Sequence, residues 1–198
     1  AGWSIVDELL RDQEDSRVTR TQIAQPANFL VQVALVAELA RYGISPAAVV
    51  GHSVGEVSAA YVSGALSLHD ALLVSLHRSR LQATMAGTGA MLAVGLPEAD
   101  ALHWIDGVPG GCVAAVNSPS AVTLAGDEQP LDQLRVALSE AGVFARALTV
   151  EVPYHSHLMD PILDDLVQVL GGLEPRVPTL PLWSTVTGEQ VTDASWGA

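Results

Sequence analysis

The sequence has no lysine, a single cysteine, few aromatic residues and few positive charges. The sequence has nine arginines and 22 acidic side chains, which gives a formal net charge of -13 at pH 7. This balance excludes an ordinary DNA- or RNA-binding domain, because phosphate backbones need a footprint of Lys and Arg. With Cys112 alone, neither a disulfide framework nor a cysteine-based zinc site can form, and we expect no metal.

Long apolar runs are also missing. No stretch reaches the roughly 18 to 20 uninterrupted apolar residues that a membrane span needs. The longest, 29–40, contains Gln32 and Glu38 and favours a buried helix. No signal-peptide pattern is recognisable, and 49% hydrophobic against 16% charged residues is typical of a globular chain with a core. We therefore expect a cytoplasmic protein without membrane or nucleic-acid contacts.

The alternation of helical and extended patterns predicts an α/β fold. In the first part we expect helices over 25–42, 55–63 and 67–85, with a short strand at 48–50. Pro26 falls in the first turn of its helix, where the missing N–H costs nothing. Ser67 and Asp70 form a capping-box-like start for the third helix.

Residues 88–150 follow a different pattern, which predicts an inserted subdomain. Its expected elements, in chain order, are strand 90–96, helix 97–105, strand 112–117, strand 121–125, helix 128–141 and strand 143–150. This βαββαβ order is the ferredoxin-like unit. A helix near 159–170 and a strand near 180–187 return the chain to the first body, so 1–87 and 151–198 are expected to form one core.

The pentapeptide Gly-His-Ser-Val-Gly at 51–55 matches the G-x-S-x-G nucleophile elbow. In that turn a serine sits between a strand and a helix, and glycine permits the close approach of backbone. The N–H of the next residue, Val54, would face the developing oxyanion at the helix N-terminus. The expected strand before it and small-residue helix after it favour a catalytic Ser53 over a purely structural turn.

A serine nucleophile needs a general base, and the sequence has six histidines. Four lie in the elbow or on predicted helices, where a structural or surface role is the simpler explanation: His52, His69, His77 and His103. His155 and His157 follow Pro153 in irregular chain, where a loop can carry a side chain into a cleft. Spacing does not choose between these two, and it leaves open that neither is the base.

The motifs together resemble the acyltransferase domain of modular polyketide synthases, which is related to the malonyl-CoA:acyl carrier protein transacylases. The resemblance covers essentially the whole chain, with motifs in the family's order at 23–27, 51–56, 60–68, 78–80, 87–91, 117–119 and around His155. It implies an α/β-hydrolase-like core with an inserted ferredoxin-like subdomain. That fold agrees with the one expected from the sequence pattern.

The resemblance also assigns roles to residues. The family signature that ends in the catalytic histidine falls on Val-Pro-Tyr-His at 152–155, so His155 is implied as the base, oriented by a backbone carbonyl or an amide group. Arg78 matches the arginine that binds a substrate carboxylate, which guanidinium does through two parallel hydrogen bonds. An ion-paired or solvated helix residue is the alternative. Gln25 and Asn117 match active-site positions, with helix-terminus and turn roles as their alternatives.

The implied activity is acyl transfer in polyketide biosynthesis, from an acyl-CoA to Ser53 and then to the phosphopantetheine thiol of an acyl carrier protein. The carrier protein and adjacent polyketide synthase domains are the expected partners. No bound cofactor is expected, because CoA is a substrate and phosphopantetheine belongs to the carrier. Tyr154, bulky where a methyl branch would lie, favours malonyl over methylmalonyl or larger units.

Two alternatives stay open. A serine hydrolase or thioesterase of the same core fold would use the same Ser and His, with an acidic residue such as Asp100, Asp127 or Asp132 between them in the chain. The other is a truncated fragment without turnover. Against the family pattern we expect a core truncated at both ends, without the N-terminal Gly-Gln-Gly turn whose region supplies a second oxyanion N–H.

Overall fold

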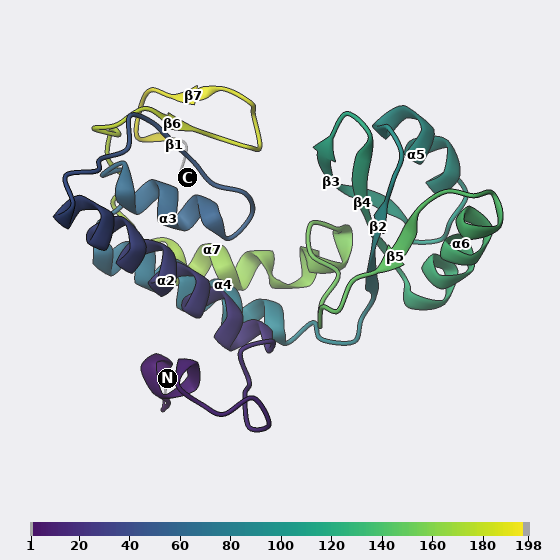
Figure 1. Ribbon diagram of the computed structural model, residues 1–198, viewed down its shortest axis with the longest axis horizontal. Coiled ribbons are helices and arrows are strands. Elements are labelled where there is room, and N and C mark those ends of the chain that lie inside the picture. Colours follow the sequence, from purple (N-terminus) through teal and green to yellow (C-terminus); the bar gives the residue numbers. More distant parts are fainter. Residues whose placement is uncertain (1, 196–198) are drawn as a thin grey trace. The chain divides into compact units, whose positions relative to one another are not determined.

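The computed structural model describes residues 2–195 (Figure 1). The chain divides into two compact units, one formed by 1–80 with 166–198 and the other by 81–165. The second unit contains the 88–150 segment together with residues on either side of it. Each unit has its own sheet and its own hydrophobic core.

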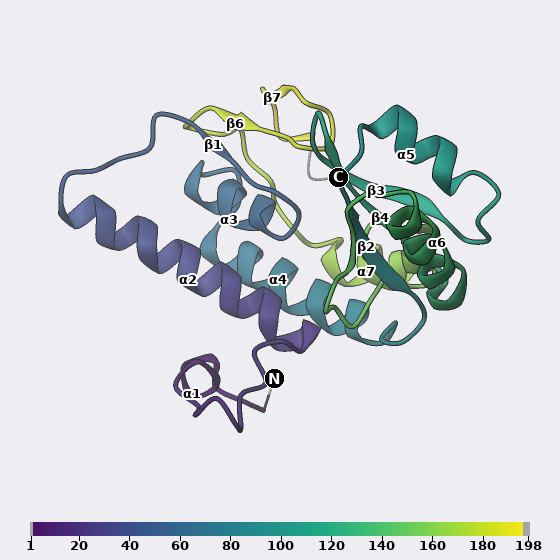
Figure 2. The same cartoon turned by 45° about the vertical axis from the view of Figure 1, so that its right-hand side comes forward.

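The first unit is built from helices packed beside a small sheet. Its helices are α1 (Ile5–Leu9), α2 (Thr21–Arg41), α3 (Gly55–Val62) and most of α4 (Leu68–Ala83) and α7 (Leu163–Leu170). Its strands are β1 (Val49–Val50), β6 (Leu182–Trp183) and β7 (Gln190–Val191), in the order β1-β6-β7. The helix α3 lies between this sheet and α2 (Figure 2). Because β1 and β6 are parallel, their carboxyl ends meet at one edge of the sheet.

Small side chains let α3 pack closely in this unit. Ala59 and Ala60 are buried, and they join a cluster with Phe29 of α2 and Leu182 of β6. The rings of Phe29 and Tyr61 meet edge to face, with centroids 6.2 Å apart and planes at 65°. This packing anchors α3 between α2 and β6, and therefore sets where the N-terminus of α3 lies.

The helix α2 begins earlier than the sequence predicts. It starts at Thr21, so Pro26 lies inside the helix, and the placement of Pro26 in the first turn is wrong. Thr21, Ile23 and Gln25 are buried with Pro26 itself. Packing of this segment therefore outweighs the backbone hydrogen bond that the proline ring forfeits, a tertiary effect that the local sequence signal does not contain.

By length and composition alone, α2 is also apolar enough to cross a membrane, the only such helix among residues 2–195. This is weak evidence, because the core helix of a soluble protein passes the same test. Its N-terminal half is buried in the unit, including Phe29 at 2% exposure.

The predicted start of α4 is confirmed. The Ser67 hydroxyl accepts a hydrogen bond from the Asp70 backbone N–H (3.1 Å) and donates one to the Asp70 carboxylate (2.7 Å). Near the C-terminus the predicted elements are shorter than expected. The helix expected over 159–170 is a 3-10 turn (η1, His157–Ile162) followed by α7, because Pro161 interrupts the helical hydrogen bonds. The strand expected over 180–187 covers only Leu182–Trp183, since the chain turns at Ser184.

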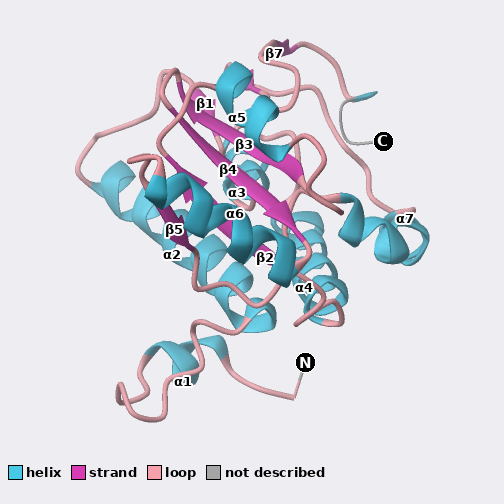
Figure 3. Cartoon of the chain, turned by 90° about the vertical axis from the view of Figure 1, so that its right-hand side faces the viewer, coloured by secondary structure: helices cyan, strands magenta, loops and turns pink. Residues whose placement is uncertain are grey.

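The second unit has the expected βαββαβ order. Its elements are β2 (Ala90–Val94), α5 (Glu98–Ile105), β3 (Cys112–Ser118), β4 (Ala121–Gly126), α6 (Glu128–Glu140) and β5 (Ala145–Ala147). The four strands pair antiparallel in the order β3-β4-β2-β5, with α5 and α6 covering one face (Figure 3). This is the ferredoxin-like arrangement. The last strand is three residues long, where the sequence predicted 143–150.

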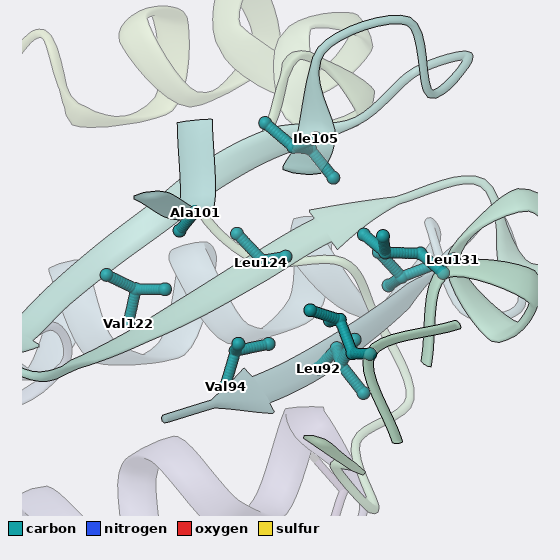
Figure 4. Close-up of a cluster of buried hydrophobic side chains, with 9 residues drawn as sticks. Leu92, Val94, Ala101, Ile105, Val122, Leu124 and Leu131 are labelled. Carbon is teal, nitrogen blue, oxygen red and sulfur yellow. The ribbon is translucent and has the colours of Figure 1, made fainter. Parts of the chain in front are cut away.

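Alternating strand residues and helix stripes build the core of the second unit (Figure 4). Leu92 and Val94 of β2 and Leu124 of β4 are at most 1% exposed, and they meet Ala101 of α5 and Leu131 of α6. Burial of such side chains stabilises a fold by about 1.5–3 kcal/mol each relative to exposure. The subdomain therefore has a core of its own.

The segment before α2 is held by a buried carboxylate. Glu8 of α1 is 2% exposed, and it accepts hydrogen bonds from the guanidinium groups of Arg17 and Arg11. The hydrogen bond from Arg17 is the main cause that lowers the pKa of Glu8, against a smaller opposing effect of burial. The same contact raises the pKa of Arg17.

These contacts predict that acid loosens the segment 2–20. Because the folded-state pKa of Glu8 is lowered, its ion pairs stabilise the fold above the unfolded-state pKa of about 4.3, and the contribution is lost as pH falls through the folded-state value. Glu8→Gln should therefore speed amide exchange in 2–20 near neutral pH, and it should match wild type once the pH has fallen below the lowered folded-state pKa of Glu8. Hydrogen exchange corrected for intrinsic rates measures this. Glu14→Gln, at an exposed carboxylate, is the matched control and should change nothing.

Candidate active site

The elbow predicted at 51–55 forms at the carboxyl end of β1. After Val50 the chain turns through His52 and Ser53 and enters α3 at Gly55. The first turn is tight: the Gly55 N–H donates to the His52 carbonyl (2.9 Å) and the Glu56 N–H to the Ser53 carbonyl (3.0 Å). Val54 lies between Ser53 and Gly55 and is the N-cap residue of α3, so its N–H is at the N-terminus of this helix. Helix N-terminal N–H groups of this kind favour negative charge.

Only one of the two elbow glycines is sterically required. A Cβ on Gly51, which is buried, would overlap the backbone of Gly55 and Glu56. A Cβ on Gly55 would meet only the Gln32 side chain, at 3.9 Å, an ordinary contact. Gly51 therefore permits β1 to approach the first turn of α3, and Gly55 is not needed for that approach.

Ser53 and His155 share an unusual backbone conformation. With φ of 51° and 58°, they are the only non-glycine residues between 2 and 195 in the left-handed region. That conformation costs an L-residue about 1–2 kcal/mol, and it persists where the surrounding structure holds it. Such residues cluster at active sites, which makes both positions candidates on structural grounds.

The loop that carries His155 is anchored by the two residues that begin its signature. Val152 and Pro153 are buried, and the Ser156 hydroxyl donates to the Pro153 carbonyl (2.6 Å). A Cβ on Gly89 would lie 3.0 Å from Pro153, so the motifs at 87–91 and 152–155 meet in the second unit. His155 itself is exposed.

Cys112 of β3 contacts the same loop. Its thiol donates a weak hydrogen bond to the His155 carbonyl, with sulfur and oxygen 3.9 Å apart. Burial raises the pKa of this thiol. Cys112 is therefore a neutral thiol at neutral pH that supports the backbone of the loop.

Arg78 and Gln25 are brought together by the fold. The Arg78 guanidinium donates to the side-chain oxygen of Gln25, 53 positions away in the sequence. Gln25 is 4% exposed, whereas Arg78 is only part-buried. A buried amide that holds one guanidinium nitrogen fixes the direction of that group, since the planar guanidinium has a rigid set of donors.

Two further predicted site residues lie in the second unit. The amide nitrogen of Asn117 donates to the Thr123 hydroxyl of β4 (2.9 Å). Asn117 belongs to β3, as the predicted strand 112–117 has it, and lies at a shift in the register of β3 with β4; the alternative role as a turn residue is not what the structure shows. Tyr154 precedes His155, and its N–H donates to the Val152 carbonyl (3.0 Å).

The candidate residues thus divide between the units. The first unit holds Ser53 with Val54, and Gln25 with Arg78; the second holds Asn117, Tyr154 and His155. No group of three or more His, Cys, Asp or Glu side chains that could hold a metal ion occurs in the part of the chain that the structure describes.

A cavity of about 560 Å³ lies between α2, the chain before β1, and α3. His52 and Gly51 line it together with apolar side chains such as Val36 and Val62, but Ser53 is not one of its lining residues.

Sequence reasoning missed one group of residues beside the elbow. The carboxylate of Glu56 accepts hydrogen bonds from Ser184 and Thr185, which follow β6. Glu56 stands in the elbow motif, but the segment at 184–185 was expected to be strand. Only the parallel pairing of β1 with β6 places the two segments side by side.

Comparison with known sequences places the chain in a family. A sequence profile described as the acyl transferase domain matches residues 1–197. The chain belongs to the acyl transferase domain family. A highly reducing polyketide synthase of Aspergillus luteorubrus, ltbA, is 42% identical over 204 residues, an alignment that covers 99% of this chain and 6% of that protein.

Solved structures of acyltransferases share the fold. The acyltransferase domain from module 8 of the salinomycin polyketide synthase superposes with a TM-score of 0.92 at 37% identity, covering 99% of this chain and 48% of that chain. The malonyl-CoA:ACP transacylase of Synechocystis sp. PCC 6803 gives a TM-score of 0.85 at 26% identity, covering 98% and 64%. The chain thus spans a small fraction of the curated relative and about half to two thirds of these solved chains.

The close approach at Gly51 predicts a sharp difference between the two elbow glycines. Gly51→Ala should destabilise the protein by about 1–3 kcal/mol, the usual cost of overpacking, and suppress labelling of Ser53 by a fluorophosphonate. Gly55→Ala is the matched control. It should be neutral, or more stable by up to about 1 kcal/mol, because alanine favours helix. Denaturant unfolding and labelling rates measure both effects, and equal behaviour of the two variants would contradict the steric argument.

Proposed function

We propose that this chain transfers a malonyl-type acyl group from acyl-CoA to Ser53 and then to the phosphopantetheine thiol of an acyl carrier protein. One observation carries the proposal: Ser53 and His155 alone, among the non-glycine residues from 2 to 195, hold left-handed backbone. Serine in a nucleophile elbow and histidine in an anchored loop are the two groups that acyl transfer requires.

In the first half-reaction His155 removes the proton from the Ser53 hydroxyl, whose oxygen attacks the thioester carbonyl. The N–H of Val54, at the N-terminus of α3, donates to the oxyanion that develops. As the C–S bond breaks, His155 returns the proton to the departing CoA thiolate. In the second half-reaction the carrier thiol loses its proton to His155 and attacks the carbonyl of the acyl-serine. The ester C–O bond breaks, and His155 returns the proton to the Ser53 oxygen.

Arg78 is proposed to bind the second carboxylate of the acyl group. Its guanidinium is permanently charged and donates in parallel to two carboxylate oxygens. The contact with Gln25 uses one of the guanidinium nitrogens and fixes the orientation of the group. Gln25 is therefore proposed as a positioning residue for Arg78. Asn117 remains a weaker candidate near the acyl group.

The names of related proteins support this choice of substrate and partner. One similar structure is a malonyl-CoA:ACP transacylase, and others belong to polyketide synthases. We therefore propose an acyl carrier protein and adjacent polyketide synthase domains as partners, and a cytoplasmic location. Tyr154 supports malonyl over larger extender units because its ring would occupy the space of a branch. We propose that no metal or bound organic cofactor takes part.

Acyl transfer predicts a covalent adduct on Ser53. Incubation of the full-length protein with malonyl-CoA should leave a malonyl group on Ser53, detected by peptide mass spectrometry, and a carrier protein should remove it. Ser53→Ala should form none, and His155→Ala should form it at least about 100-fold more slowly, because a positioned base contributes about 10²–10⁴. Release of malonate without transfer would favour a hydrolase, and absence of any adduct would favour a fragment without turnover.

The proposed carboxylate contact predicts a change of selectivity at Arg78. Arg78→Ala should slow loading from malonyl-CoA by about 30-fold or more, since loss of one partner of a charged pair costs at least about 2 kcal/mol. Loading from acetyl-CoA, which has no second carboxylate, should change little. Arg80→Ala, which removes an exposed guanidinium two positions along α4, is the matched control. Equal effects on the two acyl-CoAs would refute the assignment.

A further inference from the structure

We propose that Glu56 and Thr185 form a brace that holds Ser53 in its reactive backbone conformation, which makes both of them positioning residues. The proposal rests on the function proposed above, since it concerns the same nucleophile. It assigns a role to the carboxylate in the first turn of α3 and to the segment that follows β6.

The brace is a set of hydrogen bonds centred on one carboxylate oxygen. Oε1 of Glu56 accepts from the Thr185 backbone N–H at 3.1 Å, from the Ser184 hydroxyl at 3.3 Å, and lies 3.3 Å from the Thr185 hydroxyl. The Thr185 hydroxyl is also 3.1 Å from the Gly51 carbonyl, where it donates. Ser184–Thr185 therefore contacts the chain on both sides of Ser53, two residues before it and three residues after it.

The parallel pairing of strands makes these contacts possible. Val50 pairs with Trp183, so the two chains leave the sheet together at its carboxyl edge. The segment after β6 is itself held by a turn, in which the Ser184 N–H donates to the Glu189 carbonyl (3.0 Å) and the Gly188 N–H to the Ser184 carbonyl (3.0 Å). The hydrogen bonds of this turn therefore hold Thr185 next to the elbow.

Ser53 needs such support because left-handed backbone is unfavourable for an L-residue, and other conformations are open to it unless its neighbours are fixed. The hydrogen bond to Gly51 fixes the peptide before the elbow, and Glu56 fixes the first turn of α3 behind it. A negative carboxylate at a helix N-terminus is itself favourable there. Loss of the brace should therefore reduce the reactivity of Ser53 while leaving substrate binding at Arg78 intact.

The test uses five variants of the full-length protein and two readouts. Single-turnover acylation by malonyl-CoA reports the rate of the chemical step and the concentration for half-saturation, and a fluorophosphonate reports the nucleophilicity of Ser53 without any acyl-CoA. Glu56→Ala removes the acceptor, and Glu56→Gln keeps an acceptor oxygen without the charge. Thr185→Val removes the hydroxyl at an exposed position, and Thr185→Ser keeps it. Glu38→Gln, at an exposed ion pair on α2, is the control.

Glu56→Ala should lower both rates by about 10- to 100-fold, the scale expected when a reacting group is displaced by about 1 Å. Thr185→Val should lower them by about 3- to 10-fold, while Thr185→Ser and Glu56→Gln should stay within about 3-fold of wild type. The malonyl-CoA concentration for half-saturation should change by less than about 3-fold in all of these variants, because none of them alters the Arg78–Gln25 contact.

Any of three results would contradict the proposed brace. The first is wild-type acylation and labelling rates in both Glu56→Ala and Thr185→Val, and the second is an equal loss of rate in Thr185→Ser and Thr185→Val. The third is a change in the half-saturation concentration without a change in either rate. The proposed function fails separately. If wild type labels with the fluorophosphonate but takes no malonyl group, the function is wrong, and the labelling rates of the variants still decide the brace. If malonyl loading occurs equally in wild type and all variants, the function stands and the brace is wrong.

Discussion

The close approach of Gly51 to the first turn of α3 is the constraint on which the candidate site depends. Because a Cβ at this position would overlap the backbone of Gly55 and Glu56, strand and helix can meet at this angle only through glycine. The turn then places Ser53 in left-handed backbone with the N–H of Val54 at the helix N-terminus. The positions of the proposed nucleophile and of the proposed oxyanion donor therefore both depend on the absence of a side chain at Gly51.

Packing and strand pairing in the first unit stabilise that turn. The packing of Ala59 and Ala60 against Phe29 anchors the body of α3, and the parallel pairing of β1 with β6 anchors the strand. Hydrogen bonds from Thr185 join the two at the elbow itself. An unfavourable backbone conformation at one residue is therefore balanced by favourable contacts of many others, as is usual where strain serves function.

The second unit supports its candidate residue in a different way. His155 lies in a loop without regular secondary structure, and its position depends on the buried pair Val152 and Pro153 and on the contact with Gly89. The βαββαβ fold behind it has a separate core, so the loop is attached to a stable body. Left-handed backbone at both Ser53 and His155 indicates that each unit has backbone strain at its own candidate residue.

Local patterns in the sequence were sufficient for the element order of the second unit, the ferredoxin-like topology, the Ser67–Asp70 cap and the elbow. In the first unit they missed α1 and β7. These signals depend on spacing, turn residues and glycine, which act over a few positions. Element ends were less predictable: α2 begins at Thr21 because its first turns are buried, and Pro161 divides the last helix.

The sequence by itself determined which side chains could serve as nucleophile, base and carboxylate ligand, because those roles need particular functional groups. It could not choose between His155 and His157 by spacing, nor pair Arg78 with Gln25 across 53 residues or Thr185 with Glu56 across 129. The choice of His155 rests on the family signature at 152–155. The two pairings depend on contacts between distant segments, which local spacing does not encode, so only the tertiary structure decides them.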